Sequence, residues 1–226
     1  MSPGVGQAST RPDGGVSIVL IADRAHHPAA RILDGLAATF EVVPGAVVRV
    51  IERASGAAPA ASERVAWLHA LKRLTSPAGA ELLVSRRLDL ALALGLDGVQ
   101  LPEDALPLER VRDAFPRLIL GRSCHDRQGL ARAEGVADFA LLAPLAAPHS
   151  KPATSPPLGI AGFAAATAGL AIPVFALGGI VSEHIEPLRR AGAAGVALLG
   201  GAFDAASPRA VAERVRAIHE AWLAAA

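Results

Sequence analysis

The stretch Pro173-Val-Phe-Ala-Leu-Gly-Gly-Ile180 decides the fold, because it predicts a short buried strand that ends in a pair of glycines. Gly195-Val-Ala-Leu-Leu-Gly-Gly201 repeats the pattern further along the chain. Glycines at neighbouring strand ends let backbone N–H groups approach an anion closely, because no Cβ is in the way. In a (β/α)8 barrel the loops after the last two strands form the usual phosphate site, so the pairs Gly178-Gly179 and Gly200-Gly201 predict a barrel that binds a phosphate group.

The rest of the chain alternates between apolar strands and helices, which predicts a parallel sheet with right-handed crossovers. The other predicted strands are Val16–Ala22, Ala46–Ile51, Glu81–Ser85, Gly98–Leu101, Leu118–Gly121, Phe139–Leu142 and Val196–Leu199. The predicted helices are Pro28–Phe40, Ser62–Leu74, Arg86–Leu94, Leu108–Phe115, His125–Glu134, Gly159–Leu170, Ser182–Ala191 and Pro208–Leu223. This pattern predicts the α/β class and a single (β/α)8 TIM barrel over residues 16–226, and the Gly- and Ser-rich residues 1–15 predict a disordered N-terminal tail. No G-x-G-x-x-G follows the first strand, which argues against a dinucleotide-binding fold.

The composition narrows the functional classes. The 226 residues suit one barrel, and 52% hydrophobic residues allow a large core. A net charge of +1 argues against a general nucleic-acid binder, and no apolar run is long enough to predict a membrane span. The single Cys124 excludes an internal disulfide and a cysteine metal cluster, so a reducing, cytoplasmic location is expected.

Polar side chains gather at the carboxyl ends of the predicted strands, where the chemistry of a barrel takes place. Several are cations, which suit a phosphorylated small molecule because arginine offers paired donors and lysine a point charge. The candidates for binding it are Arg49, Arg53, Ser85, Arg86, Gln100, Ser150, Gly178, Gly179, Gly200 and Gly201, and the candidates for catalysis are Ser123, His125, His149 and Lys151.

Each candidate also has a purely structural interpretation. Alternation along its strand leaves open whether Arg49 points into the barrel or out toward a helix. Arg86 can begin a surface helix, Asp104 can be a first-turn charge, and His125 can cap a helix. Lys151 lies in a Pro-rich loop, residues 143–158, where it is either a solvated lysine or part of a lid over a phosphate. Cys124 is a small buried filler more often than a nucleophile.

Several blocks together resemble the thiamine phosphate synthase family, which includes the TenI-type thiazole tautomerases. Their order and spacing carry the resemblance, which runs from about Val16 to Phe203. The blocks are Ile18–Arg24, Leu83–Pro102, Leu120–His125, Ala137–Pro144, His149–Pro152, Pro156–Gly159, Pro173–Ile180 and Ala191–Val196.

The resemblance implies a (β/α)8 barrel that joins an aminopyrimidine pyrophosphate to a thiazole phosphate and releases pyrophosphate. It implies that Lys151 and Ser150 contact pyrophosphate, that Ser123 matches the serine after the fifth strand, and that Gly179 and the end of the eighth strand hold the thiazole phosphate. In the family, Mg2+ and basic residues stabilise the departing pyrophosphate.

This chain departs from the family pattern on the pyrophosphate side. Where the family has Gln-x-Arg-Glu-Lys, this chain has Arg49, Ile51, Glu52 and Arg53. Ser85-Arg86 replaces the Asn-Asp whose aspartate binds Mg2+, and the second metal aspartate falls at Ala105 or, with a shifted gap, at Asp104. Because Mg2+ requires oxygen ligands, we expect weak or absent binding, with no certain cofactor and Mg2+ only if synthase activity is retained.

Three functions fit these residues. A synthase would use Lys151, Arg49, Arg53 and Arg86 on pyrophosphate. A TenI-like tautomerase would need His149 or His125 as acid and base, because the histidine of that branch is Pro144 here. A non-catalytic relative would keep the phosphate site alone. The expected partners are a phosphorylated small molecule and, in a possible homodimer, a second copy of the chain.

Overall fold

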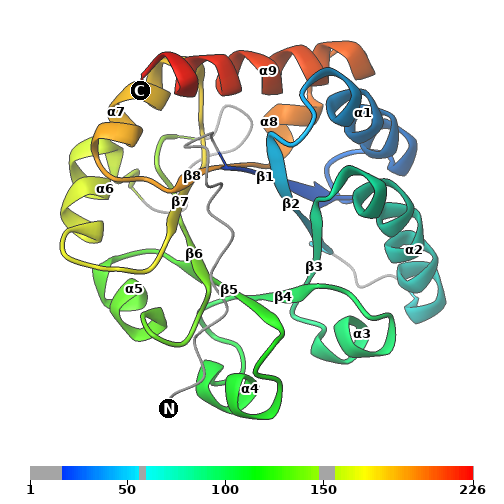
Figure 1. Cartoon of the computed structure of the whole chain (residues 1–226), viewed down its shortest axis with the longest axis horizontal. Helices are drawn as coiled ribbons and strands as arrows, with labels where there is room; N and C mark the ends of the chain where they lie inside the picture. The colour runs from blue at the N-terminus through cyan, green and yellow to red at the C-terminus, as the bar shows by residue number, and fades with distance from the viewer. Residues whose placement is uncertain (1–16, 56–59, 148–155, 226) are drawn as a thin grey trace.

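The computed structural model describes residues 17–55, 60–147 and 156–225, and these form a closed barrel of eight parallel strands inside a ring of helices (Figure 1). The predicted (β/α)8 architecture is therefore confirmed. Each strand pairs with the next in chain order, and β8 pairs with β1 to close the barrel. The strands are β1 Ser17–Asp23, β2 Val47–Arg53, β3 Glu81–Ser85, β4 Gly98–Leu101, β5 Ile119–Cys124, β6 Phe139–Leu142, β7 Val174–Leu177 and β8 Gly195–Leu198. The predicted tail, residues 1–15, lies outside the described residues.

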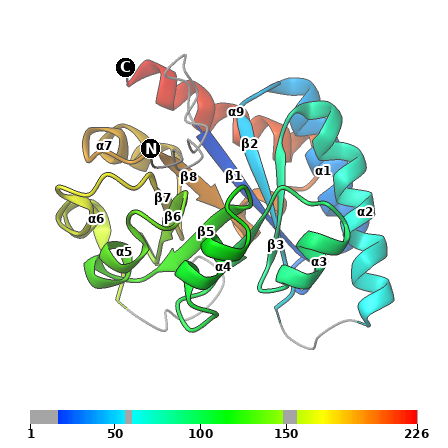
Figure 2. The ribbon, with the colours of Figure 1, turned by 60° about the horizontal axis from the view of Figure 1, so that its bottom comes forward.

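The helices flank the strands on all sides, as the tilted view in Figure 2 shows. They are α1 Ala29–Val42, α2 Ala61–Ala78, α3 Leu88–Ala93, α4 Leu108–Ala114, α5 Arg127–Ala133, α6 Gly159–Thr167, α7 Ile185–Arg190 after the 3-10 turn η1 Ser182–His184, α8 Gly200–Phe203 and α9 Pro208–Ala224. The sequence pattern did not predict α8, a single turn directly after β8. No helix in the described part of the chain is long and apolar enough to cross a membrane.

Several predicted helix ends differ from the structure. Ser62 was predicted to begin α2, but the helix begins one residue earlier, at Ala61, and Ala60 occupies the cap position. For α5 the cap is Asp126, whose carboxylate accepts a hydrogen bond from the Gly129 N–H at 2.8 Å. His125, the expected cap, lies just before it on the mouth side of β5. The predicted ends differ because hydrogen-bond geometry, rather than residue type alone, selects the capping residue.

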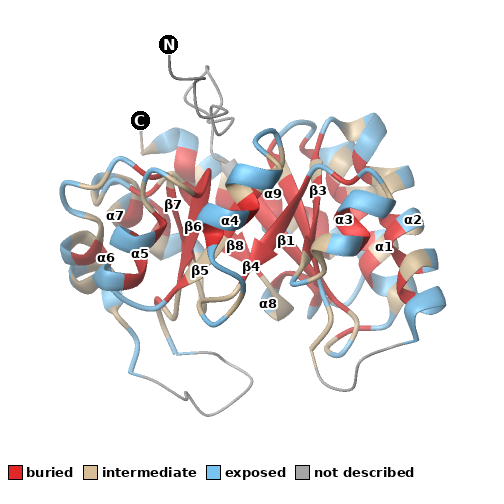
Figure 3. Cartoon of the chain, turned by 90° about the horizontal axis from the view of Figure 1, so that it is seen from below, coloured by how far each residue is buried: buried red, intermediate tan, exposed pale blue. Residues whose placement is uncertain are grey.

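The strands are largely buried (Figure 3), and their apolar residues form two layers. Residues that face outward pack against the helices in the larger core. Residues that face inward fill the barrel, and they are Val19, Ile21, Ile51, Leu83, Phe139, Leu141, Phe175 and Ala197. Both faces of each strand are therefore buried, which explains the continuous apolar runs in the sequence.

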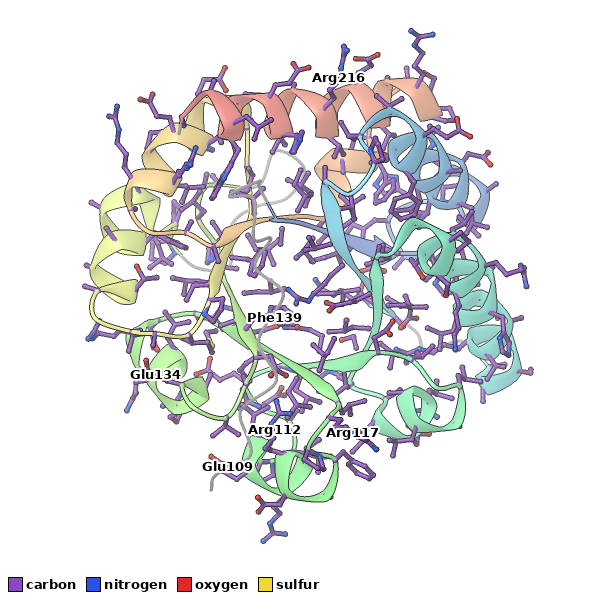
Figure 4. All side chains as sticks on the ribbon, viewed as in Figure 1. Glu109, Arg112, Arg117, Glu134, Phe139 and Arg216 are labelled. Atoms are coloured by element: carbon purple, nitrogen blue, oxygen red, sulfur yellow. The ribbon has the colours of Figure 1, made fainter. Side chains whose placement is uncertain are left out.

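Arg49 belongs to the inner layer, which settles the orientation that alternation left open. Its side chain is 1% exposed, and its Nε lies 2.6 Å from Glu81 Oε2. The guanidinium also stacks on the Phe139 ring, with 4.5 Å between its Cζ and the ring centroid. Figure 4 shows Phe139 pointing into the barrel. Burial lowers the pKa of Arg49, and the charge of Glu81 opposes that shift. Arg49 thus fills the barrel as a paired cation, and its predicted role in binding phosphate stays a prediction.

Gly121 makes room for the two largest inward neighbours of β5. A Cβ at this position would overlap Gln100 Oε1 and the Phe139 ring, and it would lie 2.8 Å from Phe139 Cε1. The side chains of β4 and β6 therefore meet across a position that carries no side chain. Because barrel interiors are close-packed, an added methyl group here has to displace one of them.

We predict that Gly121→Ala destabilises the protein by about 1–3 kcal/mol, the usual cost of overpacking a core. Chemical denaturation of both proteins would measure this difference. Gly201→Ala is the matched control, because a Cβ there meets no atom within 4 Å, and its stability should stay near that of the wild type. An unchanged stability for Gly121→Ala would contradict the packing described above.

Candidate functional site

The carboxyl ends of the eight parallel strands lie at one end of the barrel, which we call the mouth. The structure places most predicted site residues there, on strands that neighbour one another in barrel order. They are Arg53, Ser85, Arg86, Gln100, Ser123, His125, Gly178, Gly179, Gly200 and Gly201. His149, Ser150 and Lys151 lie outside the described residues, so their predicted roles stay predictions.

Arginines dominate the mouth at β2 and β3. The side chain of Arg53 is 46% exposed, and its Nε lies 3.6 Å from Asp23 Oδ2. Arg86 donates a hydrogen bond from Nη2 to Asp104 Oδ1 at 3.1 Å, and both side chains are exposed. Exposed pairs such as Arg86–Asp104 contribute little to stability, so an incoming anion can replace Asp104 at low cost. Asp23, by contrast, is buried, and only the Arg53 side of its pair is exposed.

The backbone of Arg86 has an uncommon conformation. Its φ is +66°, and among the described residues no other non-glycine residue has a positive φ. The Arg86 N–H donates to the Gln100 carbonyl at 3.0 Å, which holds the residue directly after β3. A left-handed backbone conformation costs a non-glycine residue about 1 kcal/mol. The contacts around Arg86 offset this cost and hold the residue at the mouth.

Asp23 joins the ends of β1 and β2. Its carboxylate is 2% exposed, accepts a hydrogen bond from Ser55 Oγ at 2.5 Å and another from the Ala25 N–H at 3.0 Å. Burial is the largest single influence and raises the pKa of Asp23. The hydrogen bonds from Ser55 and Ala25, together with the nearby His26, outweigh burial, so the net pKa is lowered. Asp23 therefore stays ionised beside Arg53 and fixes the geometry of this side of the mouth.

The two glycine pairs have different surroundings. Gly178 and Gly179 have φ values of +103° and +61°, and a Cβ on Gly179 would lie 2.8 Å from the Ala147 carbonyl. The segment after β6 covers this pair, since the Ala146 N–H donates to the Gly178 carbonyl at 3.0 Å. A Cβ on Gly201, by contrast, would meet no atom within 4 Å. Close packing therefore explains the first pair, while the second is open to an anion; phosphate binding by either pair stays a prediction.

His27 is a residue of the mouth that the sequence analysis did not single out. It lies after β1 but contacts the start of α8, with Nε2 3.2 Å from the Gly200 carbonyl and 3.4 Å from Asp204 Oδ1. The imidazole is 8% exposed and packs beside the Phe203 ring. His27 thus ties the open glycine pair to β1. No sequence spacing indicates a contact between residues so far apart in the chain.

Polar side chains of β4 and β5 complete the described part of the mouth. Gln100 Nε2 donates to Ser123 Oγ at 3.0 Å. His125 is exposed, and its Nδ1 lies 2.9 Å from the Ala143 carbonyl. Because a carbonyl only accepts, Nδ1 carries the proton and Nε2 of neutral His125 is left as an acceptor.

Two further strand-end residues are structural. Glu52 points outward and forms a buried pair with Arg64 of α2, with 2.7 Å between Oε2 and Nη2. Burial raises the pKa of Glu52 and Arg64 opposes the shift. Cys124 is fully buried, and burial raises the pKa of its thiol to about 12, so it is a neutral filler rather than a nucleophile.

The mouth side chains that the structure describes do not fit Mg2+. Among residues 17–55, 60–147 and 156–225, no three His, Cys, Asp or Glu side chains are grouped as metal ligands. Asp104, the weak candidate ligand, pairs with Arg86, and a guanidinium at this distance repels a divalent cation. Ser85 and Ala105 offer no carboxylate in its place.

We predict that Asp23→Asn lowers the free energy of unfolding by about 1–2 kcal/mol at pH 7. Since the folded-state pKa lies below the unfolded value, ionised Asp23 stabilises the protein above the unfolded pKa, and this contribution is lost as pH falls through the folded pKa. Urea unfolding of both proteins at pH 7 and near pH 3 should therefore show a difference that shrinks in acid. A difference that grows in acid would contradict the assignment.

Comparison with known proteins agrees with this architecture. The family model described as thiamine monophosphate synthase matches residues 18–202. The chain is 38% identical to a thiamine-phosphate synthase of Anaeromyxobacter dehalogenans, covering 79% of this chain and 78% of the relative. It is 34% identical to a thiamine-phosphate synthase of Roseiflexus sp., covering 92% of this chain and 86% of that protein.

Solved structures also include proteins with the same barrel fold. The barrel superposes on the thiamine phosphate pyrophosphorylase of Pyrococcus furiosus with a TM-score of 0.74 and 25% identity, covering 91% of this chain and 96% of that one. A structure described as native KDPGal has a TM-score of 0.68 at 19% identity and shares the fold alone. On the family match and the similarity along most of its length, this chain belongs to the thiamine phosphate synthase family.

Proposed function

We propose that the protein is a thiamine phosphate synthase, which joins an aminopyrimidine pyrophosphate to a thiazole phosphate. The observation that carries the proposal is the similarity to proteins named thiamine-phosphate synthase over most of the chain. The cationic groups and open glycines at the mouth support it, because both substrates carry phosphate groups.

In the proposed reaction the C–O bond between the pyrimidine methylene group and pyrophosphate breaks, and both electrons leave with pyrophosphate. The thiazole nitrogen then uses its lone pair to form the new C–N bond with the methylene cation. Negative charge therefore builds up on the leaving oxygen, and nearby fixed cations stabilise it most when the charge is greatest.

Arg53 and Arg86 are the described cations best placed for this role. They lie at the ends of the neighbouring strands β2 and β3, both are partly exposed, and pyrophosphate can replace Asp104 as the partner of Arg86. Lys151 and Ser150 would complete this side, as the family resemblance implies. The thiazole phosphate would lie after β8, at Gly200 and Gly201, where a Cβ on Gly201 meets no atom within 4 Å.

The assay that tests this proposal supplies both substrates to the purified protein and follows thiamine phosphate. We expect turnover with release of one pyrophosphate for each thiamine phosphate formed. Isomerisation of a thiazole carboxylate phosphate without condensation would assign the TenI-like tautomerase activity instead, with His125 as the described acid and base candidate. Binding without either reaction would identify a non-catalytic relative and contradict the proposal.

We further propose that synthesis proceeds with little need for Mg2+, because Arg86 carries the positive charge next to Asp104. Removing Mg2+ with a chelator should lower kcat less than about threefold. Arg86→Ala should lower kcat/KM by about tenfold to a hundredfold, as for the loss of one charge-stabilising group.

Arg87→Ala is the matched control for Arg86. Arg87 is the next residue, is also exposed, and donates two hydrogen bonds to Asp89 at 2.7 and 2.6 Å. Its loss should leave kcat/KM within about twofold of the wild type, which is the usual effect of a surface charge distant from the reaction. Loss of activity on chelation that Mg2+ restores would show that a metal, not Arg86, supplies the charge.

A further inference from the structure

Gln100 is an exception among the side chains that fill the barrel. It lies on the inner face of β4, since its neighbours Val99 and Leu101 belong to the outer core. Its side chain is 4% exposed, and apolar residues such as Leu83 and Phe139 fill the adjacent interior. A polar amide at such a position is unfavourable unless both its carbonyl and its amino group find partners.

The Gln100 amide finds a partner on one side only. Nε2 donates to Ser123 Oγ at 3.0 Å, but Oε1 is fully buried and has no hydrogen-bond partner among the described residues. Oε1 lies instead against Gly121, in the space that a Cβ would occupy. An apolar side chain would fill this space without leaving a buried hydrogen-bond acceptor unpaired, so packing alone does not account for a glutamine here.

The position of Gln100 links the interior to the mouth. In strand register it lies between Ser85 of β3 and Gly121 of β5. Ser85 and Ser123 are both partly exposed, so the hydrogen bond from Gln100 to Ser123 connects the buried amide to a hydroxyl that a ligand can reach. The side-chain torsions of a glutamine allow its amide to change orientation, so a ligand at the mouth can draw Oε1 away from Gly121.

We propose that the Gln100 amide, together with Ser123, recognises the amino group and adjacent ring nitrogen of the aminopyrimidine. This inference rests on the proposed synthase function and names the residue that selects its heterocycle. An amide offers one acceptor and one donor side by side, and an amino group next to a ring nitrogen offers the complementary pair. Glutamine recognises adenine through the same pairing.

The test measures binding without turnover, by titrating aminopyrimidine pyrophosphate into the protein in the absence of thiazole phosphate. A second titration uses the analogue in which hydrogen replaces the amino group. The wild type should bind the amino compound about tenfold to a hundredfold more tightly, as expected when a buried polar group loses its partner. Gln100→Met should bind both compounds with equal, weak affinity.

Thermal unfolding provides the readout that separates recognition from a structural role. If Oε1 is unpaired in the ligand-free protein, Gln100→Met removes an unsatisfied buried group, and Tm should stay unchanged or rise by about 2–4 °C. Gln128→Met is the control, because Gln128 is exposed on α5 and should retain both affinity and discrimination. Ser123→Ala should weaken binding of the amino compound more than binding of the analogue.

The outcomes are distinct. Discrimination by the wild type that disappears in Gln100→Met, with an unreduced Tm, supports the inference. Equal binding of both compounds by the wild type, or discrimination retained in Gln100→Met, overturns it while synthase turnover still stands. A lower Tm with unchanged affinities would show that Gln100 is structural and would also overturn it. Failure of the wild type to bind either compound or to form thiamine phosphate would refute the proposed function itself.

Discussion

The structure depends on how eight strands share the interior of one closed barrel. Inward side chains must fill that space without overlap, so a large residue on one strand requires a small one on its neighbour. Arg49 and Phe139 stack on one another, and Gly121 leaves room for Phe139 and Gln100. Gly98 has a similar role, because a Cβ there would lie 2.7 Å from that of Ile119. This packing sets the positions of the strand ends, and the strand ends carry the residues of the mouth.

The charged residues of the barrel fall into two groups. Arg49 pairs with Glu81 and Arg64 pairs with Glu52, and both arginines are buried, so leaving either one unpaired is costly. Arg53 and Arg86 are arginines whose side chains are exposed at the mouth. The buried arginines stabilise the barrel, while the exposed guanidinium groups can contact a ligand. Burial therefore distinguishes structural charge from charge that is available for phosphate chemistry.

The fold could be predicted from the sequence because doubly buried strands leave continuous apolar runs that helices separate. The positions of Arg53, Arg86, Ser123 and Gly201 at the mouth followed from the same alternation. The orientation of Arg49 could not be predicted, because alternation alone does not tell which face of a strand lies inside the barrel. The pairs Gly178-Gly179 and Gly200-Gly201 look alike in the sequence. In the structure, Ala146 and Ala147 pack against Gly179, while the space beside Gly201 is open. His27 could not be found, because its contact with Gly200 exists only in the closed barrel.

We propose that fixed arginines at the ends of β2 and β3, rather than a metal ion, hold the leaving pyrophosphate. A crystal structure of the protein with thiamine phosphate and pyrophosphate, grown in the presence of Mg2+, would test this proposal. We expect pyrophosphate oxygens within hydrogen-bond distance of Arg53 and Arg86, with the Arg86–Asp104 pair opened. Pyrophosphate held by an octahedral Mg2+ on Asp104, with both arginines turned away, would contradict it.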